Sequence, residues 1–94
     1  MNKYESVIII NPSIDEEGVK SLVEKFTNLI NNDGKVEKVD NLGKRKLAYE
    51  VKKQKEAYYQ VIHFEAKPAL IAELERNYRI TDDVIKFMTM KVEE

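Results

Sequence analysis

The side chains most often used in catalysis and metal binding are scarce in this sequence. His63 is the only histidine, and it lies in an alternating segment, where a hydrogen-bonded structural or surface histidine is commoner than a catalytic one. Residues 15–17 are all acidic and stand where a helix begins, so they offset the positive end of the helix dipole. The pair Asp82-Asp83 is expected to shape a turn, and alone it would hold Mg²⁺ weakly. We therefore predict no catalytic residue, no cofactor and no metal centre.

Two further kinds of chemistry are disfavoured because the residue types they require are missing. The chain has no cysteine, which excludes disulfide scaffolds, thiolate metal sites and cysteine nucleophiles. A phosphate-binding loop after the first strand would need glycine or arginine, but residues 11–13 read Asn-Pro-Ser. Phosphatase chemistry at that loop is therefore not expected.

Charge is balanced over the whole chain but unevenly distributed along it. The 94 residues include 16 basic and 17 acidic side chains, for a formal net charge of −1, and 43% are hydrophobic. This length and composition predict one globular domain, residues 1–94. Residues 35–55 hold eight basic and three acidic side chains, whereas residues 1–34 and 56–94 each sum to −3. A basic block thus lies inside an otherwise acidic protein.

No segment of the sequence is typical of membrane insertion or export. The longest strictly apolar run, residues 7–10, has four residues, against the roughly 20 that span a bilayer. The N-terminal residues lack the pattern of a signal peptide. We expect a cytoplasmic protein with no membrane partner.

Hydrophobic periodicity predicts six elements in the order βαββαβ. Residues 4–10 predict a strand, and Ser13 as N-cap opens a helix whose apolar positions recur until residues 32–34 stop it. Residues 35–51 alternate with period two, with a bulge or bend at Leu42-Gly43, and residues 52–56 predict a hairpin turn. A strand at 57–65, a helix that Pro68 opens and that runs to residue 78, and a strand at 84–92 complete the order. The strands at 4–10 and 57–65 are apolar on both sides and are expected to be central.

Two helices with one apolar stripe each can cover only one face of a four-stranded sheet. Right-handed crossovers place both helices on the same face. The predicted fold is therefore α+β, a ferredoxin-like βαββαβ sandwich with a four-stranded antiparallel sheet and two helices on one face. The second sheet face stays open, and apolar or aromatic side chains on it would make it a contact surface.

The basic block is the strongest functional signal in the residues themselves. Lys44, Arg45 and Lys46 are consecutive, so in a strand the two lysines project to one side and the arginine to the other. Together with Lys52 and Lys53 at the hairpin, they can track a phosphate backbone without reading bases. The competing interpretation is that lysines protect an edge strand from aggregation.

Four sequence features, spread over essentially the whole chain, occur together in one known family. They are Tyr4-Glu5 at the start of the first strand, Asn11-Pro12 at its end, residues 43–51, and residues 82–86. Residues 43–51 read Gly-Lys-Arg-Lys-Leu-Ala-Tyr-Glu-Val, and their Gly-x-Arg-x-Leu-Ala-Tyr core is specific. The sequence resembles the family of the sixth protein of the bacterial small ribosomal subunit.

This resemblance implies the fold reached above and a structural role without catalysis, cofactor or small-molecule substrate. It also implies binding to the central domain of small-subunit ribosomal RNA, as a heterodimer with the eighteenth small-subunit protein. The family often has Arg directly after the initiator Met, where this chain has Asn2 followed by Lys3. With that shift, the candidate RNA contacts are Lys3, Lys44, Arg45, Lys46, Lys52, Lys53, Lys86 and Lys91.

A protein with a net charge of −1 gains little long-range attraction to RNA. We therefore expect a more basic partner protein to dock on the open sheet face, with Tyr59 and Val61 as anchors, and the pair to bind RNA cooperatively. The alternative function is a small-ligand-binding regulatory module or an acylphosphatase-like enzyme on the same topology. That alternative predicts a concave pocket with convergent polar groups, whereas the ribosomal interpretation predicts a shallow sheet face and a basic ridge.

Overall fold

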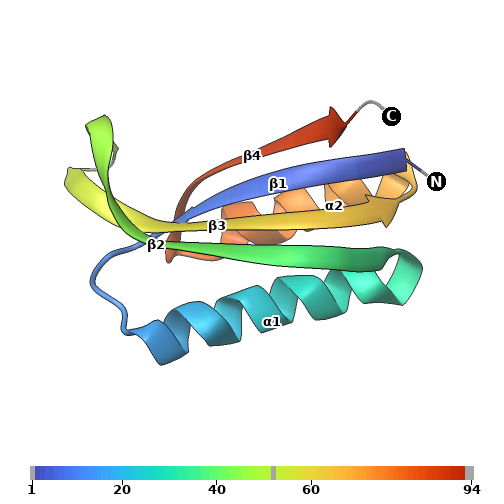
Figure 1. Ribbon diagram of the computed structural model, residues 1–94, viewed down its shortest axis with the longest axis horizontal. Helices are drawn as coiled ribbons and strands as arrows, with labels where there is room; N and C mark the ends of the chain where they lie inside the picture. The colour runs from blue at the N-terminus through green and yellow to red at the C-terminus, as the bar shows by residue number, and fades with distance from the viewer. Residues whose placement is uncertain (1, 52, 93–94) are drawn as a thin grey trace.

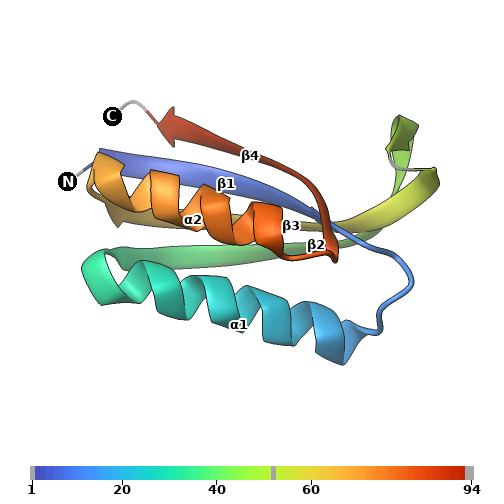
Figure 2. The ribbon, with the colours of Figure 1, turned by 180° about the vertical axis from the view of Figure 1, so that it is seen from behind.

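The computed structural model describes residues 2–51 and 53–92, and its elements follow the predicted order. They are β1 (Asn2–Ile10), α1 (Glu16–Asp33), β2 (Lys35–Val51), β3 (Gln54–Ala66), α2 (Pro68–Ile80) and β4 (Val84–Val92). The strands form one antiparallel sheet in the order β2-β3-β1-β4, so β1 and β3 are central as predicted. Both helices lie on the same side of this sheet (Figure 1 and Figure 2). The predicted ferredoxin-like sandwich is confirmed.

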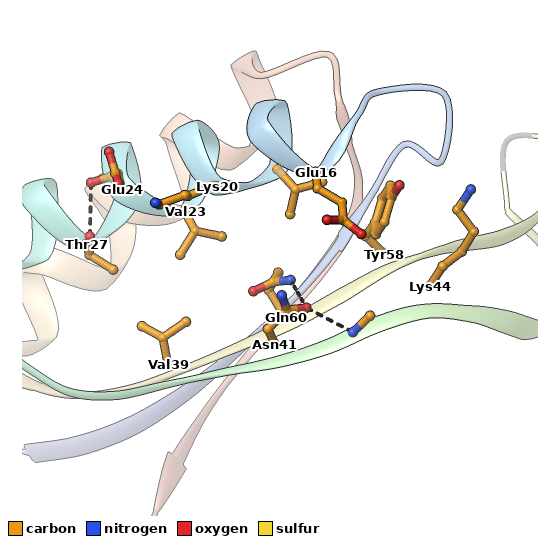
Figure 3. A pocket seen from close by; sticks show the side chains of 12 residues that line it. Glu16, Lys20, Val23, Glu24, Thr27, Val39, Asn41, Lys44, Tyr58 and Gln60 are labelled. Atoms are coloured by element: carbon orange, nitrogen blue, oxygen red, sulfur yellow. Dashed lines mark hydrogen bonds between the residues drawn. The ribbon is translucent and has the colours of Figure 1, made fainter.

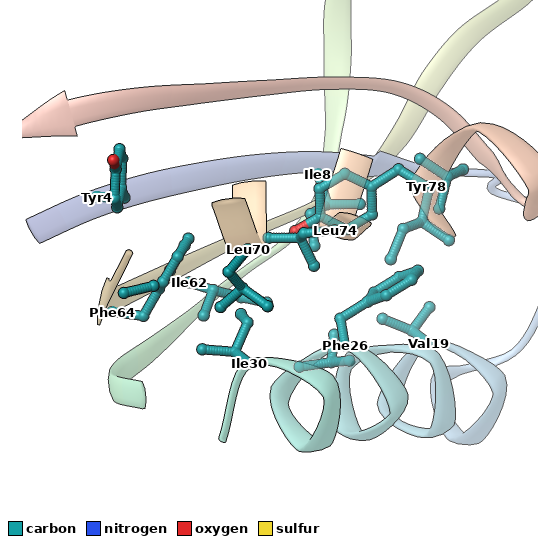
Figure 4. Packing of buried hydrophobic residues seen from close by; sticks show 14 residues of the cluster. Tyr4, Ile8, Val19, Phe26, Ile30, Ile62, Phe64, Leu70, Leu74 and Tyr78 are labelled. Atoms are coloured by element: carbon teal, nitrogen blue, oxygen red, sulfur yellow. The ribbon is translucent and has the colours of Figure 1, made fainter. Parts of the chain in front are cut away.

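The main core fills the space between the sheet and the helices (Figure 4). Phe26 of α1 and Tyr78 of α2 are fully buried, and their rings meet edge to face with centroids 4.6 Å apart. Ile8 of β1 pairs with Gln60 of β3 and Phe87 of β4. This register turns the even-numbered residues of β1 and β3 towards the helices, and in β4 the odd-numbered residues from Phe87 onwards. A register shift opposite Ile9 and Ile10 reverses the order at the start of β4, where Val84 faces the helices and Ile85 the open side. The remaining residues of these strands face the open side.

A second, smaller apolar cluster lies on the open side of the sheet. Its buried members are Ile9, Ala57 and Ile85, and partly buried side chains pack against them: Leu47, Val51 and Tyr59. The β2–β3 hairpin bends out of the plane of the sheet at this end (Figure 1). The hairpin therefore covers one end of the face that the helices leave open.

The start of α1 differs from the prediction. Asp15 is the N-cap in place of Ser13, and its Oδ1 accepts a hydrogen bond of 2.8 Å from the Gly18 N–H. The Ser13 N–H instead donates to Oδ1 of Asn11 at 2.9 Å. Because this side-chain bond closes a turn over residues 11–13, the helix begins only after it.

The connection between β2 and β3 is shorter than the turn that the sequence predicts at residues 52–56. Val51 pairs with Gln54, so β3 begins inside that polar segment. The predicted irregularity at Leu42-Gly43 is confirmed, because the register shifts between Asn41 and Gly43. Gly43 has φ +73°, and its N–H donates to Oδ1 of Asn41 at 3.0 Å. Only glycine adopts this left-handed conformation without a steric cost.

Candidate functional site

The three consecutive cations lie on β2, an edge strand, and alternate between its sides as predicted. Lys44 pairs with Tyr58 of β3, and its Nζ lies 5.2 Å from the centroid of that ring on the helix-covered side. Arg45 projects to the opposite side, where its Nε donates to the Leu42 carbonyl at 3.1 Å. Lys46 returns to the side of Lys44. The block therefore presents positive charge on both sides of one edge and does not form a single row.

The hairpin end adds further cations. Lys46, Lys53 and Lys55 line one trough with a volume of about 730 Å³, together with Glu50 and Glu56. Lys52, which the sequence also predicts as an RNA contact, lies outside the described residues. The trough is thus bordered by three lysines and two glutamates.

The other candidate cations are divided between the two ends of the sheet. Lys86 of β4 lies at the hairpin end, and its Nζ donates to the hydroxyl of Tyr49 at 2.7 Å. Lys3 pairs with Val92 and Lys91 with Tyr4 at the opposite end. The register places Lys3 and Lys86 on the open side and Lys91 on the helix side. The predicted contacts thus form two separated groups.

None of the seven described candidate cations forms an ion pair with a carboxylate of the described residues. The ion pairs found there belong to other basic side chains, namely Lys38, His63 and Arg79. Among the described residues, the seven cations are therefore not held in direct ion pairs, although Glu50 and Glu56 border the hairpin trough.

An exposed apolar stripe crosses the open sheet face. Val61 of β3 lies opposite Val7 of β1, and Val7 lies opposite Met88 of β4. Met88 is 51% exposed and Met90, two residues further along β4, is 42% exposed. Val61 is a residue that the sequence predicts as an anchor; the two methionines are not among the predicted anchors, although the alternation of residues 84–92 puts them on one side.

Tyr59 lies in a different environment from Val61. Its ring packs against the small cluster of Ile9, Ala57 and Ile85 beneath the hairpin. Only Val61 of the two predicted anchors therefore belongs to the exposed stripe, and Tyr59 supports the bent hairpin beside it.

His63 lies on the open face between two carboxylates, as expected for a hydrogen-bonded surface histidine. Its Nε2 is 2.9 Å from Oδ2 of Asp40 on β2, and its Nδ1 is 3.3 Å from Oε1 of Glu5 on β1. The hydrogen bond from His63 and, after it, that from Lys38 hold the pKa of Asp40 below its usual value. Because the two ring nitrogens point to carboxylates on opposite sides, the three groups do not converge on a common point.

A groove runs between α1 and the edge strand β2 (Figure 3). Its volume is about 730 Å³. On its floor, the side chain of Gln60 donates to Oδ1 of Asn41 at 2.7 Å, and that oxygen also accepts from the Gly43 N–H. Val19 and Val23 of α1 line the opposite wall. This is the concave feature that the ligand-binding alternative predicts, but Gln60 and Asn41 bond to each other across its floor.

Within residues 2–51 and 53–92, no group of three His, Cys, Asp or Glu side chains is arranged to hold a metal ion. In the same part of the chain, neither helix combines the length and hydrophobicity that a membrane span requires.

Comparison with known proteins gives one consistent family. The model of the family described as ribosomal protein S6 matches residues 3–91. The small ribosomal subunit protein bS6 of Clostridium kluyveri is 54% identical over 95 aligned residues and is covered completely, as is this chain. The bS6 protein of Heliobacterium modesticaldum is 44% identical, with 100% of this chain and 99% of that protein covered.

Solved structures give the same result for the fold. The 30S ribosomal protein S6 of Thermotoga maritima superposes with a TM-score of 0.92 at 40% identity, over 97% of this chain and 87% of that one. A protein from Arabidopsis thaliana reaches a TM-score of 0.58 at 14% identity, over 100% of this chain and 95% of that one. At that identity the second likeness concerns the fold alone.

Proposed function

This chain belongs to the ribosomal protein S6 family and is a structural protein of the small ribosomal subunit, and from that premise we propose that it binds the central domain of small-subunit ribosomal RNA together with the eighteenth small-subunit protein. Membership also confirms the expected cytoplasmic location on the ribosome. Because the family is not enzymatic, the alternative of an acylphosphatase-like enzyme falls away.

The observation that carries the RNA proposal is the set of described candidate cations without a carboxylate partner. Four of them lie towards the hairpin end of the sheet, distributed over both of its sides: Lys44, Arg45, Lys46 and Lys86. Phosphate oxygens are the natural counter-ions for such a group, and contacts of this kind position a protein on RNA without reading its sequence. The separated pair Lys3 and Lys91 would meet a second part of the RNA backbone.

The open sheet face supports the proposal of a protein partner. The stripe of Val61, Val7 and Met88 is apolar and lies outside the cluster that the hairpin covers. Burying exposed aliphatic side chains contributes roughly 25 cal/mol for each Å² removed from water. This stripe therefore suits docking of a protein better than contact with phosphates.

Net charge explains why the partner would be needed for RNA binding. With 16 basic and 17 acidic side chains, this protein has no overall attraction to a polyanion. A more basic partner on the open face would supply that attraction, and the local cations would then set the orientation. The two proteins together would recognise folded RNA by its shape and backbone.

Gel-shift titration of a central-domain RNA fragment tests this cooperative scheme. We expect weak binding by either protein alone and tight binding by the two together. Tight binding by this protein alone would overturn the cooperative scheme, and no binding by the pair would overturn the RNA proposal itself.

The cation block is tested by replacing Lys44, Arg45 and Lys46 with Ala. We expect weaker binding and a salt dependence reduced by up to about 0.9 log units for each phosphate group that is no longer neutralised. The matched control replaces Lys20, Lys25 and Lys67, three exposed lysines of the helical layer, and should leave the salt slope unchanged. If the block variant keeps its salt slope but self-associates, these cations protect the edge strand and do not bind RNA.

The partner surface is tested with Met88→Glu. A carboxylate buried against a partner carries a desolvation cost, so capture of the partner protein should weaken. Ile80→Glu serves as the control, because Ile80 is 63% exposed but lies at the end of α2 in the helical layer. Equal loss from both variants would contradict docking on the open face.

A further inference from the structure

Tyr49 is the only large aromatic side chain of the described residues that is mostly exposed. Its exposed fraction is 64%, and the other exposed large hydrophobic residues of the described chain are valine, leucine, isoleucine and methionine. It lies near the tip of β2, between the register shift that follows Lys46 and the end of the strand at Val51. It does not belong to the small apolar cluster beneath the hairpin. No packing role of the described core accounts for this ring.

The ring is held by one directed contact. Nζ of Lys86 lies 2.7 Å from the Tyr49 hydroxyl oxygen and 5.2 Å from the ring centroid. The ammonium is therefore nearly twice as far from the centre of the ring as from its hydroxyl end, so it sits beyond that end and not above a face. The contact orients Tyr49, and the ammonium group does not cover the centre of either ring face.

The surroundings of Tyr49 are basic. The ring lines the hairpin trough, about 730 Å³ in volume, with Lys46, Lys53 and Lys55. Glu50 and Glu56 also line it, and Lys86 adds one more cation through the hydroxyl contact. The trough and Lys86 together present four positive and two negative side chains around one exposed aromatic face.

An exposed aromatic ring among cations is the arrangement with which proteins bind unpaired nucleotides. We propose that Tyr49 stacks against an unpaired base of the bound RNA, with Lys86 and the trough lysines at the flanking phosphates. The base must be unpaired because bases inside an RNA helix already stack on their neighbours and present only their edges. This inference rests on the proposed RNA binding and adds to it a defined contact with a looped or bulged nucleotide.

The test measures the affinity of Tyr49 variants for the central-domain RNA fragment in the presence of the partner protein. Tyr49→Ala should weaken binding by about fivefold to a hundredfold, with an unchanged salt slope because the ring carries no charge. Tyr49→Phe keeps the stacking face and should stay within about twofold of the parent protein. Tyr49→Leu keeps an apolar side chain but loses the flat face, and should behave like Tyr49→Ala.

Lys86→Gln provides the complementary measurement. It removes a charge and keeps a hydrogen-bond donor, so it should lower the salt slope, which Tyr49→Ala should not. The matched control is Leu42→Ala, because Leu42 is 41% exposed on the same strand as Tyr49. This control should leave RNA affinity unchanged.

Three outcomes would overturn the stacking inference. Unchanged affinity of Tyr49→Ala, with weaker binding by the variant at residues 44–46, would refute stacking and leave the RNA proposal intact. Loss of partner capture by Tyr49→Ala in the absence of RNA would assign the ring to the protein interface. Failure of the parent protein and its partner to bind the fragment would remove both proposals together.

Discussion

The hydroxyl groups of Ser6 and Tyr78 lie 2.8 Å apart in the core, although 72 positions separate them in the sequence. Ser6 is on β1 and Tyr78 on α2, and both are fully buried. Oγ of Ser6 is also 3.0 Å from Oγ1 of Thr89 on β4. Burial raises the pKa of the Tyr78 hydroxyl well above its usual value. A chain of three hydroxyl groups thus joins a helix to two neighbouring strands, from the buried Tyr78 to the partly buried Thr89.

This arrangement predicts unequal costs for its two ends. Ser6→Ala leaves the buried Tyr78 hydroxyl without its partner, so we expect a loss of about 1–3 kcal/mol in the free energy of unfolding. Tyr78→Phe removes that hydroxyl, while Ser6 keeps its contact with Thr89, so its cost should be about 1 kcal/mol. Urea unfolding of both variants and of the double variant measures the difference. A larger loss for Tyr78→Phe than for Ser6→Ala would contradict this account.

The start of α1 gives a second prediction. Because Asp15 caps the Gly18 N–H at 2.8 Å, Asp15→Ala should lower the free energy of unfolding by about 0.5–2 kcal/mol. Ser13→Ala is the matched control, since Ser13 only donates its backbone N–H to Asn11 and keeps that bond as alanine. Thermal and urea unfolding of the two variants decide between the caps. A greater loss from Ser13→Ala would restore the N-cap that the sequence predicted.

The Asp15 cap illustrates what periodicity predicts and what it leaves open. The apolar spacing of α1 and the alternation of the strands depend on which residues must be buried, so they give the element order and the sheet. Ser13 and Asp15 are both good N-cap residues, and the choice between them depends on the Asn11 side chain, which closes the preceding turn. Element boundaries are decided by such single hydrogen bonds, which periodicity does not reveal.

The candidate site was predictable in its residue types but not in its arrangement. Three register shifts interrupt the pairing of β2 with β3, after Val36, Asn41 and Lys46. Each shift changes which side of the strand the next residues occupy, and the bend of the hairpin brings Tyr49 to Lys86, 37 positions away. Alternation along β3 therefore does not reveal that Tyr59 packs beneath the hairpin, nor does alternation along β2 reveal the contact of Tyr49 with Lys86.

Gly34 and Gly43 should respond differently to the same substitutions. A Cβ at Gly34 would collide with the backbone carbonyl oxygen of Glu65, so Ala and Asn there should each lower the free energy of unfolding by about 1–3 kcal/mol. A Cβ at Gly43 meets nothing within 4 Å, but φ there is +73°. Asn tolerates this left-handed conformation better than Ala, so Gly43→Asn should cost less than Gly43→Ala.

Urea unfolding of the four glycine variants gives the comparison. An advantage of Asn over Ala at both positions would show that backbone conformation, and not the contact with Glu65, limits Gly34.

The contact between His63 and Asp40 predicts a change in the acid stability of the protein. The pKa of Asp40 is lowered mainly by the hydrogen bond from His63 and secondarily by that from Lys38. A carboxyl group whose pKa is lower in the folded state stabilises the fold above its unfolded-state pKa, and this contribution disappears as the pH falls through the folded-state pKa. His63→Ala should therefore raise the pKa of Asp40 towards its usual value, and Lys38→Ala should raise it less.

NMR titration of the Asp40 carboxyl carbon measures these shifts directly, and urea unfolding between about pH 2 and pH 5 measures their consequence. The difference in the free energy of unfolding between the parent protein and His63→Ala should be largest near about pH 5 and should shrink as the pH falls and Asp40 becomes protonated. His63→Ala also removes the ion pair with Glu5. The same comparison is therefore repeated in a protein that carries Asp40→Asn, where the contribution of Asp40 to the stability difference should be absent. An Asp40 pKa that is identical in the parent protein and in His63→Ala would refute the role assigned to this hydrogen bond.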